Sequence, residues 1–284
     1  MSPLFATYIR SDSPLMSNNE TVAKLLFAAE MGIPAVFTPC SALGVTAPAS
    51  IAGVLVQTLA DALFTVVLCG LKKPGMPLLL GGIQTVMRQA KETLSYGSPE
   101  LHLTSAAMTE IYKWLGLLNS SAGGCTDAKI VDEQAASESV MSIYNNMLAG
   151  TNLVHQVGCL DGGLTGSLSS LVMCDEIIAM IKQIAKGIQV TDETLALDIL
   201  KEVGPGGEFL SHDHTYDHWK EWFRPTIIDR SNFEAWSEAG SKTYNDRLEP
   251  EVDRILESHA HEPFDENIVQ EMKKNINLAD NKEV

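Results

Sequence analysis

Three histidines stand at metal-ligand spacing in the C-terminal part of the sequence, inside residues 204–240. His214 and His218 are four positions apart, so they would share one face of a helix, and His212 lies two positions upstream. Imidazole nitrogens bind zinc, and three of them can form a site. The same spacing suits a surface turn whose histidines cap helices or pair with acidic residues. A metal-dependent enzyme using these histidines and an ordinary surface turn both remain open.

The same stretch is dense in large aromatic and charged residues. It holds three tryptophans and an Asp-Arg pair: Trp219, Trp222, Trp236, Asp229 and Arg230. Tryptophan and arginine are enriched where proteins dock on one another. A docking surface is therefore the alternative to a metal site here.

His155 is the best candidate for chemistry outside that stretch. It lies near the C-terminal end of a predicted strand, residues 151–158, and active-site groups of parallel α/β proteins gather at such ends. A histidine there can orient a carboxylate or bind a substrate, and a core histidine bonded to the backbone fits equally well. Asp161 and the flexible Gly162-Gly163 pair follow on the same loop. The acid could attract a cationic substrate, or it could be a solvated turn residue.

A second strand-end loop, residues 123–129, combines two glycines with Cys125, Asp127 and Lys129. Its glycines would let the backbone approach a ligand closely. A catalytic cysteine needs a lowered pKa, for which Lys129 is only a hint. The sequence has no Gly-x-Gly-x-x-Gly, no Walker lysine loop and no Gly-x-Ser-x-Gly elbow, which argues against a nucleotide enzyme or a serine hydrolase.

Alternating helices and apolar strands must position these residues. We predict helices at 21–31, 48–71, 98–115, 132–148, 168–184 and 192–203, and strands at 33–38, 78–81, 117–124, 151–158 and 188–190, with a loop at 82–97. Apolar strands without polar alternation indicate a parallel sheet covered by helices. A closed (βα)8 barrel needs three more strands. The pattern predicts either a small open sheet or the C-terminal part of a TIM-type barrel at residues 1–203, followed by a helical extension, residues 204–284, packed on it.

Composition limits the partners. The 284 residues carry a net charge of −16, which disfavours nucleic acid and favours small cationic ligands. Five widely spaced cysteines without a Cys-x-x-Cys pair fit reduced thiols in a cytoplasm. Residues 47–71 are long and apolar enough to span a bilayer, but Gln57 and Asp61 fall inside them. We therefore predict a buried helix there and no membrane partner.

Several segments together resemble the trimethylamine methyltransferase family, which contains the corrinoid-dependent methylamine methyltransferases and their non-pyrrolysine quaternary-amine relatives. The resemblance covers nearly the whole chain. It rests on FTPCSALGVTAPASIAGVL from Phe37, YGSPE from Tyr96, CTDAKIVDEQAASE from Cys125, GTNLVHQVGCLDGGLTGSL from Gly150, and GGEFLSHDHTYDHWKEWFRPTIIDRSNFEAWSEAG from Gly206.

The resemblance implies a (βα)8 barrel and transfer of a methyl group from an amine to the cob(I)alamin of a separate corrinoid protein. No cofactor or metal would be bound directly, and no catalytic residue is assigned. The implied substrate-binding residues are His155, Asp161, Gly163, Asp127 and Tyr96. The last motif, from Gly206, is then a family signature. It would hold the C-terminal helices in place or contact the corrinoid partner, and its residues are His214, Trp222, Pro225, Asp229, Arg230 and Trp236.

The chain departs from the family pattern in two ways. Family members carry a long N-terminal section, and this chain begins near the middle of that pattern, so we expect a truncation or a second polypeptide that completes the barrel. The trimethylamine enzymes contain pyrrolysine, and this sequence has none. The resemblance therefore implies a glycine betaine-like quaternary amine, with trimethylamine as the other substrate.

An incomplete barrel would expose an apolar sheet edge, so we expect a homo-oligomer. A non-catalytic barrel fragment or assembly subunit is the rival hypothesis to an enzyme.

Overall fold

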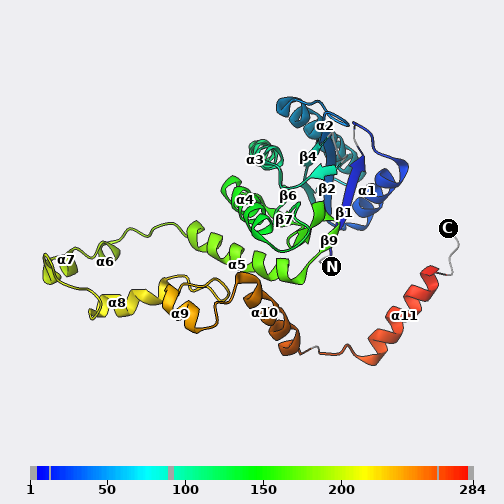
Figure 1. Ribbon diagram of the computed structural model, residues 1–284. Helices are drawn as coiled ribbons and strands as arrows, with labels where there is room; N and C mark the ends of the chain where they lie inside the picture. The colour runs from blue at the N-terminus through cyan, green and yellow to red at the C-terminus, as the bar shows by residue number, and fades with distance from the viewer. Residues whose placement is uncertain (1–4, 13, 89–92, 261, 281–284) are drawn as a thin grey trace.

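The computed structural model describes residues 5–12, 14–88, 93–260 and 262–280. A body of strands covered by helices is followed by an elongated segment that leaves the body after α5 and returns to it at α10 (Figure 1). We call this segment, residues 186–243, the arm. The last helix, α11, extends beyond α10.

Parallel strands follow one another in space in their chain order. The described strands are β1 Thr7–Asp12, β2 Ala35–Leu43, β3 Leu78–Leu80, β4 Ile83–Arg88, β5 Thr93–Ser95, β6 Ser120–Ala122, β7 Leu153–His155, β8 Cys159–Leu160 and β9 Thr165–Gly166. β2 pairs in parallel with β1 on one side and with β3 and then β4 on the other. A parallel bridge between Leu80 and Asn119 joins β3 to the start of β6, and β6 pairs in parallel with β7.

Helices connect these strands and then build the arm. The body holds α1 Asn19–Met31, α2 Ile51–Lys72, α3 Pro99–Trp114, α4 Glu133–Ala149, the 3-10 turn η1 Asp161–Gly163 and α5 Leu168–Ala185. The arm holds α6 Asp192–Leu195, α7 Leu197–Val203, α8 Asp213–His218, the 3-10 turn η2 Trp219–Glu221 and α9 Phe233–Glu238, and it is followed by α10 Tyr244–Ser258 and α11 Glu266–Asp280.

The described strands form an open parallel α/β arrangement, and no closed barrel is present among them. The predicted α/β class is therefore confirmed at this level. The boundary predicted between residues 203 and 204 falls at Gly204, which caps α7 within the arm, and it stays a prediction. The predicted strand at 188–190 is wrong, because these residues are exposed and lie outside any strand.

One other local prediction fails for a physical reason, and one strand had no prediction. Most of the loop predicted at 82–97 is instead β4 and β5, and β1 was not predicted at all. β4 has a polar sequence, but its buried polar side chains are hydrogen-bonded. Gln84 Nε2 donates to Thr58 Oγ1 at 3.1 Å, and Thr85 Oγ1 donates to the carbonyl of Ser41 at 3.3 Å. Hydrogen-bonded polar side chains can occupy a buried strand, so polarity alone misidentified this segment.

Two apolar cores hold the molecule together. One lies between the sheet and α1 to α3, and its largest fully buried side chains include Phe37, Leu80 and Tyr112. The other joins α4 and α5 to the C-terminal part of the chain, through Ile227 and Leu248. The C-terminal part of the chain therefore packs on the body through α10 and the residues just before it, and the predicted extension at 204–284 stays a prediction.

α2 is only half buried. Its inward side chains, among them Val54, Ala62 and Cys69, pack on the sheet, whereas its outward side exposes large apolar side chains. It is the described helix that is long and apolar enough to cross a membrane, a weak criterion that core helices also meet. The prediction of a buried helix thus holds for one side of α2 and fails for the other.

Candidate functional site

His155 ends β7 and lies at the carboxyl ends of the parallel strands, as predicted. Its ring meets the ring of Tyr8 from β1 edge to face, with centroids 5.3 Å apart and planes at 76°. The buried Nε2 atom has no hydrogen-bond partner in the part of the chain that the structure describes. Burial lowers the pKa of His155 to about 4, so the imidazole is neutral at physiological pH.

Tyr96 lies beside this pair. Burial raises the pKa of its hydroxyl to about 12, against the lowering effect of a hydrogen bond with Gln156. Tyr8, Cys40 and Cys125 also act electrostatically on this hydroxyl, which places all three nearby. Two tyrosines from separate segments thus flank the end of β7 with uncharged rings.

Gln156 is a residue that sequence reasoning missed. Its backbone takes a φ of 66°, a left-handed conformation that is uncommon for a non-glycine residue. Its Oε1 atom is buried and finds no partner among the described residues. In the sequence, only its position directly after His155 could have indicated that Gln156 belongs to the candidate site.

Asp127 positions Tyr96. Its Oδ1 atom accepts the Tyr96 N–H at 2.7 Å and its Oδ2 atom accepts the Ser95 hydroxyl at 2.5 Å. Asp127 is itself held by α4, because Glu138 Oε2 accepts its N–H at 2.7 Å. Glu138 was not predicted, since nothing in an amphipathic helix marks a carboxylate that anchors a distant loop.

Asp161 and Gly163 lie on the neighbouring turn. The Asp161 N–H donates to the carbonyl of Ala128 at 2.8 Å, and its carboxylate pairs with Lys129 at 2.9 Å. A Cβ built on Gly163, whose φ is 87°, would lie 3.7 Å from the Cys125 sulfur. The structure therefore brings Tyr96, Asp127, Asp161 and Gly163 to one edge of the sheet with His155.

Cys125 is not prepared as a nucleophile. Burial raises the pKa of its thiol to about 12, which is opposite to what a reactive cysteine requires. Lys129, the base suspected of activating it, instead contacts Asp161 and the carbonyl of Asp127.

The three histidines of the arm have other contacts. His212 Nδ1 accepts the N–H of His214 at 3.0 Å and so caps α8. The rings of His214 and His218 lie 4.3 Å apart, and His218 Nδ1 is 3.1 Å from Glu221 Oε1. No group of three His, Cys, Asp or Glu side chains that could hold a metal occurs within the described residues.

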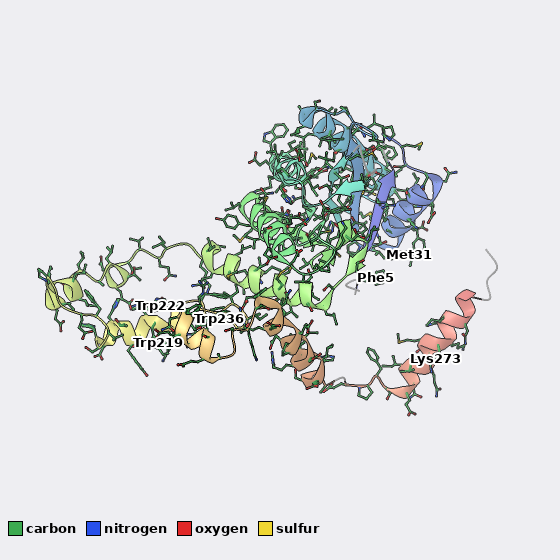
Figure 2. The ribbon with its side chains drawn as sticks, in the orientation of Figure 1. Phe5, Met31, Trp219, Trp222, Trp236 and Lys273 are labelled. Carbon is green, nitrogen blue, oxygen red and sulfur yellow. The ribbon has the colours of Figure 1, made fainter. Side chains whose placement is uncertain are left out.

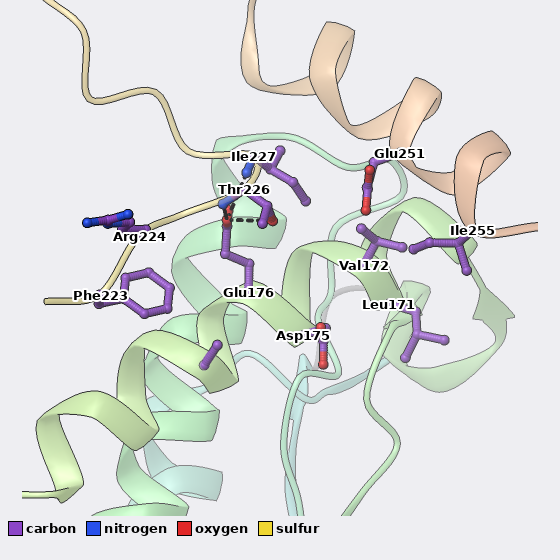
Figure 3. Close-up of a pocket in the computed structure, with 11 residues that line it drawn as sticks. Leu171, Val172, Asp175, Glu176, Phe223, Arg224, Thr226, Ile227, Glu251 and Ile255 are labelled. Atoms are coloured by element: carbon purple, nitrogen blue, oxygen red, sulfur yellow. Dashed lines mark hydrogen bonds between the residues drawn. The ribbon is translucent and has the colours of Figure 1, made fainter. Parts of the chain in front are cut away.

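Glu176 of α5 anchors the end of the arm. Its two carboxylate oxygens accept the backbone N–H groups of Thr226, Ile227 and Ile228 at 2.5, 2.8 and 2.9 Å. Figure 3 shows Glu176 with Thr226 and Ile227. A pocket of about 580 Å³ lies beside this contact, between α5, residues 223–227 and α10. Apolar side chains of Leu171, Val172 and Ile255 line it, together with the carboxylates of Asp175 and Glu251 (Figure 3).

Other signature residues hold the arm and its return to the body. Trp236 Nε1 donates to the carbonyl of Lys242 at 3.0 Å, and Asp229 lies 4.0 Å from the guanidinium of Arg247. Arg247 Nε donates to the carbonyl of Ile227 at 2.6 Å. Trp222 and Arg230 are exposed and Pro225 is half-buried. Figure 2 shows Trp222 and Trp236 on the arm, away from the strand-end cluster.

Residues 1–282 match the family described as trimethylamine methyltransferase (MTTB). The chain is 36% identical over 271 residues to trimethylamine methyltransferase MttB of Desulfitobacterium hafniense (strain DSM 10664 / DCB-2), covering 95% of this chain and 55% of the relative. It is 33% identical over 278 residues to trimethylamine methyltransferase MttB of Methanosarcina barkeri (strain Fusaro / DSM 804), covering 98% of this chain and 56% of the relative.

A third relative is the glycine betaine methyltransferase of Desulfitobacterium hafniense (strain Y51), 32% identical over 268 residues, covering 94% of this chain and 56% of the relative. The chain thus spans about half the length of the curated relatives it matches. The family match extends from the first strand through the arm to α11. The chain belongs to the trimethylamine methyltransferase (MTTB) family.

Proposed function

We propose that this chain acts in an amine methyltransferase that moves a methyl group from a quaternary or tertiary amine to the cob(I)alamin of a separate corrinoid protein. The names of its relatives support the amine and the methyl transfer. The corrinoid acceptor follows from the resemblance described above, and it is a second substrate rather than a group that the chain holds.

The observation that carries the proposal is the uncharged aromatic cluster of Tyr8, Tyr96 and His155 at the strand ends. A quaternary ammonium cannot donate a hydrogen bond from nitrogen, so it binds aromatic faces, with about 0.5–2 kcal/mol per cation–π contact. A protonated imidazole would repel it, but burial lowers the pKa of His155 and keeps this ring neutral.

A quaternary amine also suits the acid–base character of the cluster. When its C–N bond breaks, nitrogen keeps the electron pair, and a neutral tertiary amine leaves without a proton. Co(I) supplies the electron pair of the new bond to the methyl carbon. Since no proton must be transferred, the residues around Tyr96 would act by alignment and by exclusion of water. We therefore favour a glycine betaine-like substrate over trimethylamine.

The strand order supports a barrel as the complete fold. β1, β2, β3 with β4, and β6 with β7 lie side by side in chain order, each followed by a helix on the outside, as in part of a (βα)8 TIM barrel. The edges that lack a partner among the described strands would accept the remaining strands. These strands would come from a segment equivalent to the other half of the relatives.

Incubating the protein with reduced corrinoid protein and glycine betaine tests the proposal. We expect dimethylglycine and methylated corrinoid in equal amounts. Trimethylamine is tested as the second substrate in a parallel incubation. Absence of methyl transfer from any quaternary or tertiary amine, with binding also absent by calorimetry, would favour the rival hypothesis of a non-catalytic assembly subunit.

We expect the rate with a quaternary amine to be nearly independent of pH from about 6 to about 9, varying less than about threefold. The pKa of His155 is lowered to about 4, and those of Tyr96 and Cys125 are raised to about 12, so none of the three changes charge in this range. The measurement is kcat/KM for glycine betaine across that range. A step with a midpoint near 6.5 that disappears in His155→Asn would show that this ring titrates during turnover.

A further inference from the structure

The outward side of α2 presents an uninterrupted apolar stripe. Val56, Leu63, Phe64, Val67 and Leu71 are all exposed, with Val56 at 70%, Val67 at 60% and Leu71 at 82%. Between Ile51 and Leu71 the only charged residue is Asp61, and its side chain is buried on the opposite side. Proteins rarely leave a contiguous apolar patch of several hundred Å² uncovered. No described part of the chain packs on the stripe of α2, so the stripe is open to a partner.

The neighbours of α2 show from which direction a cover must come. α2 packs on β2 with its inward side and on α1 and α3 with its flanks (Figure 1). A cover for the outward side of α2 would therefore approach from outside this layer of helices.

The spacing of the stripe matches a helix-to-helix seam. Val56, Ala60, Leu63, Val67 and Gly70 are separated by four, three, four and three residues, and all five are exposed. This is the alternation that brings successive side chains against a second helix in coiled-coil packing. The seam runs from Val56 to Gly70, or roughly 22 Å at about 1.5 Å per residue.

The area of the stripe suits a small dimer interface. With about 150–200 Å² for each fully exposed large side chain, the exposed parts of the stripe amount to roughly 450–600 Å². Two copies packed on each other would bury roughly 900–1,200 Å², the size of a weak specific protein–protein interface. A single amphipathic peptide would cover the stripe equally well, but only a second copy brings an identical apolar surface that needs the same cover.

We propose that α2 packs against α2 of a second copy of this chain, antiparallel and around a two-fold axis near Leu63 and Phe64. Lys72, which pairs with Glu30 at 2.9 Å, and Lys73 close the C-terminal end of the stripe. A parallel pair would bring the Lys73 side chains of both copies together, whereas an antiparallel pair separates them and aligns the helix dipoles favourably. In this arrangement Val56 faces Leu71 of the other copy, and Ala60 faces Val67. The interface goes beyond the proposed function and does not depend on it.

Sedimentation equilibrium over a range of concentrations tests the interface. The wild-type chain should form dimers, and Val67→Glu should raise the dimer Kd at least about 100-fold, because each copy would bury a carboxylate at the seam. Leu71→Glu, at the end of the stripe, should have a smaller effect. Leu148→Glu on α4 is the matched control, since Leu148 is 67% exposed and lies outside the stripe, and its Kd should stay within about threefold of wild type.

The orientation has its own test. Mixed Val56→Cys and Leu71→Cys variants should give a heterodimer with a short bis-maleimide, whereas either variant alone should cross-link weakly. Two results would overturn the proposal. One is a dimer that Val67→Glu leaves intact, and the other is a monomeric wild type that sediments with phosphatidylcholine vesicles, which would assign the stripe to a membrane surface.

Discussion

Replacing Glu176 with leucine is expected to detach residues 223–228 from α5 and to destabilise the C-terminal part of the chain by about 2–3 kcal/mol. Three backbone N–H groups would lose their acceptor. The bond of Ile227 is buried and those of Thr226 and Ile228 are partly buried, and an unsatisfied buried group costs about 1–3 kcal/mol. The seating of Ile227 and Leu248 in the second core depends on the same contact. Hydrogen exchange of residues 223–258 and urea unfolding measure the effect.

Two variants separate this anchoring from a general disturbance of α5. Glu176→Gln keeps an amide oxygen that can accept part of the bonding, so it should cost much less than the leucine variant. Asp175→Leu changes an exposed carboxylate one position earlier and should leave exchange in residues 223–258 unchanged. If Glu176→Leu exchanged as slowly as wild type, the arm would be held by its apolar contacts instead.

The helices of the body were predictable because their signals are local. A side chain with a capping oxygen precedes each of α1, α3, α4 and α5 and accepts a bond from the first turn: Asn18, Ser98, Asp132 and Ser167. Such caps, followed by apolar residues at helical spacing, are recognisable in a sequence. The strands were harder. β1 is covered on one side only, where Ile9 is buried while Tyr8 is exposed, and β4 buries Gln84.

The position of the candidate site was predictable from the sequence, but the hydrogen bonds that connect its residues were not. A histidine at the end of an apolar strand and glycines on the next loop locate the carboxyl edge of a parallel sheet. The sequence could not show that Glu138 holds Asp127 or that Asp127 holds Tyr96, because these bonds join residues 11 and 31 positions apart. Tyr8 was missed for the same reason. Its ring meets His155 only once β1 and β7 are brought together in the fold.

Tyr96→Ala is expected to weaken binding of a quaternary ammonium by about 30-fold. The loss of one desolvated cation–π contact is worth about 2 kcal/mol, which corresponds to that factor in Kd. Asp127 holds the Tyr96 backbone, so the ring is positioned before the ligand arrives and its full contribution should be felt. Isothermal titration with tetramethylammonium and with glycine betaine gives the Kd of each variant.

The choice of replacement shows which part of Tyr96 binds. Tyr96→Phe keeps the aromatic face and loses only the hydrogen bond with Gln156, so its Kd should stay within about threefold of wild type. Tyr216→Ala removes an exposed tyrosine of the arm and should change nothing. A loss with phenylalanine as large as that with alanine would mean that the hydroxyl, not the ring, contacts the ligand. Since the carboxylate of glycine betaine can accept from that hydroxyl and tetramethylammonium cannot, a loss confined to glycine betaine would assign the hydroxyl to the carboxylate.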